Sequence, residues 1–170
     1  VHPRDRSVMV YVPAGEFIMG MNADESQKLA HALGYKDYHI IAAEEWAPQH
    51  KVWVEGFFID KYEVTFEQWN VFAKETKYES KLSKAPEPGI KGDEDLFPAV
   101  SGTWAEAQKY ANWVGRTRPY ETQWEKAARG TDARWFPWGN ELPSPDRGAF
   151  VNLSKEKKNQ ATAAQMVGLH

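Results

Sequence analysis

Residues 118–140 read RPYETQWEKAARGTDARWFPWGN and hold three of the chain's eight tryptophans. Pro119 suits the entry of a helix, because its fixed φ is already helical and the N–H that it lacks would have no partner there. Gly130 can adopt the left-handed conformation that often ends a helix. The stretch therefore predicts a helix over residues 121–129, followed by an aromatic segment rich in turn residues.

The segments on the N-terminal side alternate apolar runs with turn residues. Residues 8–20 contain two β-branched runs around Pro13-Ala14-Gly15, which predicts a β-hairpin. Residues 22–33 favour a helix. Residues 48–64 alternate apolar and polar side chains on both sides of Gly56 and predict two further strands.

Two more helices are predicted from capping boxes, in which the side chains of residues three apart bond each other's backbone N–H. The boxes are Thr65 with Gln68 and Thr103 with Glu106. They predict helices over residues 65–75 and 103–114. In the second helix one apolar face is expected in the core, and its members are Trp104, Ala107, Tyr110, Ala111 and Val114.

Composition and charge exclude several classes of partner. The net charge is −3 and the pI about 6.0, so the sequence lacks the basic character of a nucleic-acid-binding domain. No apolar run approaches the roughly 18 residues that a membrane-spanning helix needs. The 170 residues contain no cysteine, so they offer no disulfide, thiolate metal site or cysteine nucleophile. We expect one domain over residues 1–170 that contacts neither nucleic acid nor membrane.

Several motifs together resemble the formylglycine-generating enzyme family, also called the sulfatase-modifying factor family. In chain order they are VPAGEFIMG at 12–20, PQHKVWV at 48–54, FFIDKYEVT at 57–65, FPAV at 97–100, PYETQWEKAARG at 119–130 and FPWGN at 136–140. The resemblance implies an α+β fold, distantly similar to C-type lectins, with short strands, three or four short helices and much irregular chain. In the family a second half follows a valine-glycine-hydrophobic run such as Val167-Gly168-Leu169, so we expect the N-terminal portion of that domain.

The resemblance also implies a chemistry that these residues do not supply. Members of the family hold a copper ion with two cysteines in the later part of the domain and use dioxygen to oxidise a substrate cysteine to formylglycine. Soft thiolates suit cuprous copper, and the chain has none. The sequence also lacks a serine-hydrolase elbow, a phosphate-binding glycine loop and a zinc-peptidase helix. We therefore assign no catalytic residue, and do not expect this chain alone to be an enzyme.

Calcium is the one cofactor that the resemblance implies as a candidate. Asn152 and Leu153 occupy the place where the family contributes a side-chain oxygen and the next backbone carbonyl to a structural calcium ion. Calcium takes about six to eight oxygens, and the aspartate that the family supplies about fourteen residues later is missing. No aspartate follows Asn152 in this chain. We expect an incomplete site with weak or absent calcium binding.

Structural roles are predicted for the remaining prominent residues. Three tryptophans of residues 118–140 are expected to pack in the core and lock the fold: Trp124, Trp135 and Trp138. Glu121 and Arg129 are expected to brace the fold. Asn140 is expected to fix a turn. His50 is expected to be a structural residue at a strand edge. Residues 77–98, with three prolines and an acidic run, are expected to form a long surface loop.

Two functions are consistent with these observations. The first, which we favour, is a non-catalytic subunit of an extracytoplasmic complex, in which a rigid aromatic scaffold presents loops to a protein partner. The second is one half of a split or nicked formylglycine-generating-type oxidoreductase whose cysteines lie on another segment. Both predict a hetero-oligomer, because a half-domain exposes apolar surface that a partner must cover. The location outside the cytoplasm rests on the family, whose members are commonly exported.

Overall fold

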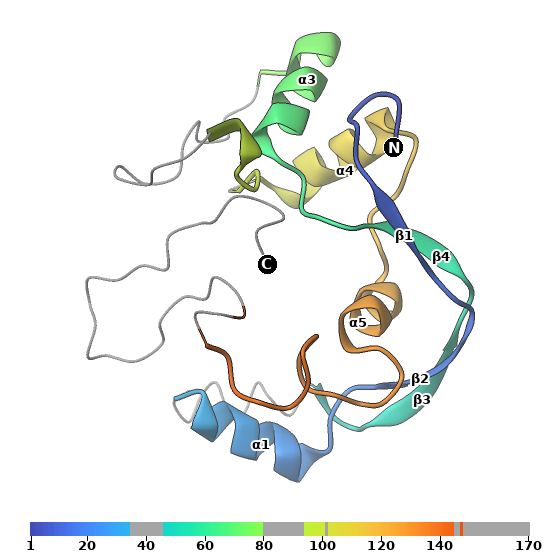
Figure 1. The fold of residues 1–170 in the computed structure, drawn as a ribbon, viewed down its shortest axis with the longest axis vertical. Coiled ribbons are helices and arrows are strands. Elements are labelled where there is room, and N and C mark those ends of the chain that lie inside the picture. Colours follow the sequence, from blue (N-terminus) through green and yellow to red (C-terminus); the bar gives the residue numbers. More distant parts are fainter. Residues whose placement is uncertain (35–45, 80–93, 101, 145–146, 148–170) are drawn as a thin grey trace. The chain divides into compact units, whose positions relative to one another are not determined.

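The computed structural model describes residues 1–34, 46–79, 94–100, 102–144 and 147. The elements are β1 (Met9–Val12), β2 (Gly15–Met19), α1 (Ala23–Ala32), β3 (His50–Val54), β4 (Phe57–Asp60), α3 (Phe66–Thr76), the 3-10 helix η2 (Glu94–Leu96), α4 (Trp104–Trp113) and α5 (Glu121–Arg129) (Figure 1). They confirm the predicted α+β class with short strands and helices. The described residues form two compact units, residues 1–10 with 58–118 and residues 11–57 with 119–144.

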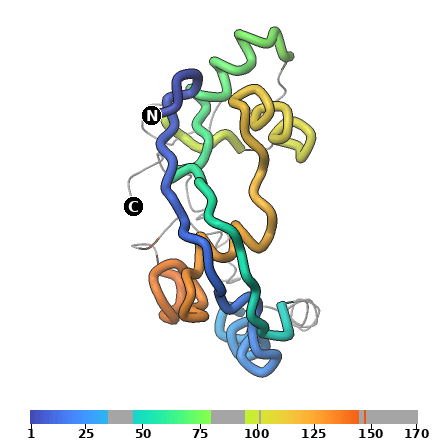
Figure 2. Tube along the Cα trace, turned by 90° about the vertical axis from the view of Figure 1, so that its right-hand side faces the viewer, coloured from blue at the N-terminus to red at the C-terminus, as the bar shows by residue number. Residues whose placement is uncertain are grey.

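The strands pair differently from the predicted hairpin. β2 pairs antiparallel with β3, in a register that places Phe17 opposite Val52, and β1 pairs with β4. Figure 2 shows residues 15–19 and 50–54 running side by side. The prediction of a β-hairpin over residues 8–20 is therefore wrong, although both of the predicted strands form. A two-residue hairpin loop needs positive φ at its first central residue, which here would be Pro13, and proline cannot adopt it.

The first unit is built on an aromatic core between α3 and α4. The rings of Trp69 and Tyr110 stack with centroids 5.8 Å apart, and Phe72 meets both edge-on at 5.0 and 5.6 Å. Phe97 inserts beside them, held by the bond from the Phe66 N–H to the Phe97 carbonyl at 2.9 Å. Ring pairs of this kind stabilise a core beyond the area that they bury.

Both predicted capping boxes are confirmed. The backbone N–H of Thr65 donates to Gln68 at 2.8 Å and that of Thr103 to Glu106 at 2.8 Å, and each threonine accepts in return. The core face predicted for α4 is correct only in part. Its later members are buried, whereas Trp104 is 65% exposed and Ala107 is exposed.

The second unit packs α5 against the β2–β3 ribbon. Phe17 and Val54 of the ribbon are buried there. Lys126 of α5 is buried as well, and its ammonium donates to the carbonyls of Pro13 and Gly15 at 2.7 and 2.9 Å. These bonds pin the segment between β1 and β2 to α5 and offset the cost of burying the charge.

Candidate functional site

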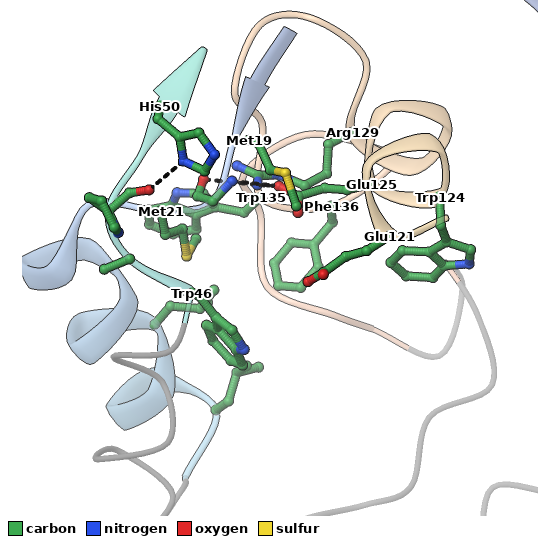
Figure 3. A pocket seen from close by; sticks show the side chains of 15 residues that line it. Met19, Met21, Trp46, His50, Glu121, Trp124, Glu125, Arg129, Trp135 and Phe136 are labelled. Carbon is green, nitrogen blue, oxygen red and sulfur yellow. Dashed lines mark hydrogen bonds and ion pairs between the residues drawn. The ribbon is translucent and has the colours of Figure 1, made fainter. Parts of the chain in front are cut away.

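A pocket of about 410 Å³ lies beside α5 in the second unit (Figure 3). Its lining comes from the end of β2, from α1, from the segment that leads into β3, from α5 and from the turn segment after α5. The lining residues are Met19, Gly20, Met21, Leu29, Leu33, Trp46, Ala47, Pro48, His50, Glu121, Trp124, Glu125, Arg129, Trp135 and Phe136. The pocket thus brings part of the 118–140 stretch next to His50.

Four aromatic side chains dominate the lining. Trp46 is 44% and Trp124 is 62% exposed, while Trp135 and Phe136 are half-buried. The prediction that Trp124 locks the fold is wrong, because α5 turns the side of Lys126 toward the ribbon. Residues two apart on a helix point in nearly opposite directions. Exposed tryptophans at the rim of an apolar pocket are typical of a binding surface.

Glu125 and Arg129, one turn apart on α5, build one wall of the pocket. Glu125 Oε1 accepts the N–H of Gly20 at 2.7 Å, and Arg129 Nη1 donates to the Gly20 carbonyl at 2.9 Å and to Glu125. Arg129 also donates to the carbonyls of Arg134 at 2.6 Å and Ala133 at 3.3 Å. The predicted bracing role of Arg129 is confirmed, and all three of its guanidinium nitrogens are engaged.

Gly20 allows two segments of the chain to approach each other at this wall. Its φ is +75°, and a Cβ built on it would lie 2.6 Å from the carbonyl oxygen of Trp46. The next residue, Met21, donates its N–H to that same carbonyl at 2.7 Å. The position of Trp46 at the pocket rim therefore depends on a glycine at position 20.

Glu121 and His50 are the charged or polar side chains of the described lining that lie outside the Glu125–Arg129 pair. The Glu121 carboxylate makes no hydrogen bond or ion pair with another residue in the described part of the chain, so its predicted bracing role is not seen there. His50 begins β3 as predicted, and its Nδ1 lies 2.8 Å from the Pro48 carbonyl. Because a carbonyl only accepts, Nδ1 donates, and Nε2 of the neutral ring remains an acceptor.

The pocket offers few groups for covalent chemistry. Its described lining includes no serine, threonine, cysteine, lysine or tyrosine that could act as a nucleophile. Among the residues that the structure describes, no three histidine, aspartate or glutamate side chains are placed to hold a metal ion. The copper of the resembled enzymes does not fit a chain without cysteine. Asn152 and Leu153, the predicted calcium ligands, lie outside the described residues.

The remaining residues of the 118–140 stretch shape the turn segment after α5. Asn140 Oδ1 accepts the N–H of Trp135 at 2.8 Å, which confirms its predicted role in a turn. Trp138 stacks on Phe136 with centroids 5.1 Å apart and donates its indole N–H to the Glu141 carbonyl at 2.9 Å. Sequence reasoning missed Trp46, because it falls in a segment without periodicity.

Arg129→Lys is expected to lower the free energy of unfolding by about 2 kcal/mol, because an ammonium cannot replace the fork of bonds to Gly20 and the turn segment. The matched control is Arg134→Lys, where the guanidinium pairs with the exposed Asp132 at 2.7 Å. An exposed pair contributes about 0–1 kcal/mol. Urea unfolding of both variants measures the difference, and equal losses would contradict the bracing role of Arg129.

No helix in the described ranges is long and apolar enough to cross a membrane. This finding agrees with the hydropathy of the sequence, in which no long apolar run occurs.

Comparisons with known proteins identify the family of the chain. It is 31% identical over 145 residues to the uncharacterized protein YfmG of Bacillus subtilis, covering 79% of this chain and 28% of YfmG. It is 27% identical over 186 residues to the mouse inactive C-alpha-formylglycine-generating enzyme 2, covering 86% of this chain and 54% of the relative. It is 28% identical over 190 residues to the mouse formylglycine-generating enzyme, covering 88% and 47%.

The solved structure of PvdO from Pseudomonas aeruginosa is similar in fold. It aligns with a TM-score of 0.59 at 25% sequence identity, over 83% of this chain and 54% of PvdO. The chain thus spans about half the length of PvdO and of the two mouse relatives. The model of the sulfatase-modifying factor enzyme 1-like domain matches residues 2–168. The chain therefore belongs to the sulfatase-modifying factor enzyme 1-like family.

Proposed function

We propose that this chain is a non-catalytic member of its family and serves as a binding subunit of an extracytoplasmic protein complex. The observation behind this proposal is the composition of the pocket: exposed Trp46 and Trp124 stand beside a wall whose charged pair, Glu125 and Arg129, is engaged in bonds to backbone. A pocket that exposes aromatic surface, and whose described lining holds no serine, threonine, cysteine, lysine or tyrosine, is suited to binding. The similarity to a mouse relative named as inactive supports a non-catalytic role.

A protein partner is the ligand that best suits exposed tryptophans. Tryptophan is enriched among the residues that contribute most of the energy of protein interfaces, because it buries a large area with few rotatable bonds. The hetero-oligomeric state and the location outside the cytoplasm are parts of this proposal. The second of them rests on the family resemblance.

A second candidate is one half of a formylglycine-generating maturation oxidoreductase. The similarity to the mouse formylglycine-generating enzyme favours it, since the chain covers 47% of that enzyme and the thiolates could come from another segment. In that case the partner polypeptide supplies two cysteines. The two candidates therefore differ in what the partner contains.

Trp124→Ala is expected to reduce the amount of partner that purifies with this chain at least tenfold, because the exposed indole is lost from the binding surface. Its melting temperature should change by less than about 2 °C, since an exposed side chain contributes little to the fold. The matched control is Trp53→Ala in β3, because Trp53 is 61% exposed and lies outside the pocket lining. Native purification followed by quantitative mass spectrometry measures the amount of partner recovered with each of the two variants.

Three outcomes separate the candidates. Loss of the partner with Trp124→Ala alone supports the binding subunit. Equal partner recovery from both variants overturns the pocket as the binding site. A partner with paired cysteines, in a complex that converts a cysteine peptide to formylglycine, favours the maturation enzyme and overturns the non-catalytic role of the assembly.

A further inference from the structure

The pocket indicates the chemistry of its ligand, an inference that rests on the proposed function. We propose that it accepts the ammonium group of a lysine side chain from the partner, with the aliphatic stem against the tryptophans and the charge near Glu121. The charges, the aromatic faces and the cost of the alternatives all favour this occupant.

The described lining holds two carboxylates, Glu121 and Glu125, and one guanidinium, Arg129. Arg129 and Glu125 neutralise each other and hold Gly20 from both sides. Glu121 is then the remaining charged group without a partner among the described lining residues. Figure 3 shows its side chain extending from α5 toward Phe136. A ligand that neutralises this carboxylate must be a cation.

The hydrogen-bonding groups favour a donor. The Glu121 carboxylate accepts only, and in the tautomer of His50 that donates from Nδ1 to the Pro48 carbonyl at 2.8 Å the other ring nitrogen, Nε2, is an acceptor. A primary ammonium has three donors and no acceptor. It can bond the carboxylate while its remaining donors meet water or another acceptor.

The aromatic lining favours a cation as well. Elsewhere in the molecule the chain's own cations cover aromatic rings: Arg118 lies 4.2 Å from the Trp104 centroid and Lys109 lies 4.6 Å from the Tyr78 centroid. Such contacts are attractive because the face of an aromatic ring is negative, and they are strongest with tryptophan. In the described part of the chain no such cation covers Trp46 or Trp124.

Other ligand classes would meet an energetic penalty. An anion would be repelled by Glu121. A purely apolar side chain would bring no charge or donor to this carboxylate and would leave it without a partner. The flexible apolar stem of lysine can cover aromatic surface while its charge stays near the carboxylate, as long cationic side chains do at other interfaces.

Titration of the chain with Nα-acetyl-lysine amide tests the proposal, with the tryptophan indole N–H signals followed by NMR. We expect a saturable shift, and at least tenfold weaker binding of Nα-acetyl-norleucine amide, which keeps the stem but lacks the ammonium. Equal binding of the two compounds would overturn the proposal. At least tenfold tighter binding of choline than of the lysine compound would overturn lysine as the occupant.

Glu121→Gln should weaken binding of the lysine compound about tenfold, and a variant that binds as tightly as the parent chain would overturn the role of Glu121. The matched control is Glu67→Gln, because Glu67 is also an exposed glutamate in the first turn of a helix, α3. It should leave binding unchanged, and equal weakening by both variants would contradict a specific site. Thermal unfolding should show both variants folded, since neither removes a described contact.

The two proposals fail separately. If Trp124→Ala loses the partner but the lysine compound does not bind, the ligand class is wrong and the binding site stands. If the lysine compound binds but partner recovery does not depend on Trp124, the proposed function is wrong and the cation pocket stands.

Discussion

Gly20→Ala is expected to lower the free energy of unfolding by about 3 kcal/mol. Its φ of +75° costs a residue with a Cβ about 1–2 kcal/mol. The added Cβ would also lie 2.6 Å from the Trp46 oxygen and 3.0 Å from the Pro48 oxygen. Both are backbone atoms, so relief requires the two segments to separate, at a further cost of about 1–3 kcal/mol.

Gly34→Ala is the matched control for this prediction. Gly34 has a φ of +77°, and no atom of the described residues lies within 4 Å of a Cβ at this position. Only the backbone conformation is penalised, and we expect a loss of about 1 kcal/mol. Urea unfolding of the parent and both variants measures the difference. If Gly34→Ala costs as much as Gly20→Ala, the close approach to Trp46 and Pro48 does not constrain position 20.

Asp5→Ala is expected to produce the second large loss, about 3 kcal/mol. Asp5 is 4% exposed, and its carboxylate accepts the N–H of Ser7 at 3.1 Å, the Ser7 hydroxyl at 2.8 Å and the Tyr110 hydroxyl at 2.9 Å. Arg116 Nη1 lies 3.9 Å from the same carboxylate. Removing the carboxylate leaves the buried Tyr110 hydroxyl without its acceptor and Arg116 with one fewer negative neighbour.

The Asp5 carboxylate also makes the free energy of unfolding depend on pH in the acidic range. Burial raises the pKa of Asp5, but the bonds from Ser7 and Tyr110 and the charge of Arg116 outweigh it, so the pKa lies below its ordinary value of 3.8. With the folded pKa below the unfolded one, this contribution is present above about pH 4 and is lost as the pH falls through the folded pKa. The parent chain should therefore lose more stability than Asp5→Ala on acidification.

Urea unfolding at neutral pH and at about pH 3 tests both statements about Asp5. Asp24→Asn is the control, because Asp24 is an exposed aspartate in the first turn of α1. It should change stability by less than about 1 kcal/mol. Identical loss on acidification of the parent chain and of Asp5→Ala would contradict the assignment of this pH dependence to Asp5.

The helices could be predicted from sequence because their signals are local. The predicted helix over residues 121–129 matches α5 at both ends. The boxes at Thr65 and Thr103 form because a capping box needs only residues three positions apart. The strands were also located correctly, but the one predicted pairing, the hairpin over residues 8–20, does not form. Pairing of β2 with β3 joins segments on either side of α1, and no short-range pattern encodes it.

The buried side of α5 shows why the pocket could not be predicted. Hydrophobicity alone would bury Trp124 and expose Lys126, yet Trp124 is 62% and Lys126 5% exposed. Lys126 is buried because the carbonyls of Pro13 and Gly15 accept its ammonium. Those carbonyls lie 113 and 111 positions before Lys126 in the chain, so no local pattern in α5 encodes the contact.

The sequence by itself determined the family, the bounds of α5, the capped starts of α3 and α4, and the absence of thiolate chemistry in these 170 residues. Each depends on residue identity or on neighbours a few positions apart. Only the tertiary structure decided the partners of the strands, the exposed side of α5 and the pocket beside it. These depend on contacts between segments far apart in the chain, such as the bonds between Gly20 and the Glu125–Arg129 pair.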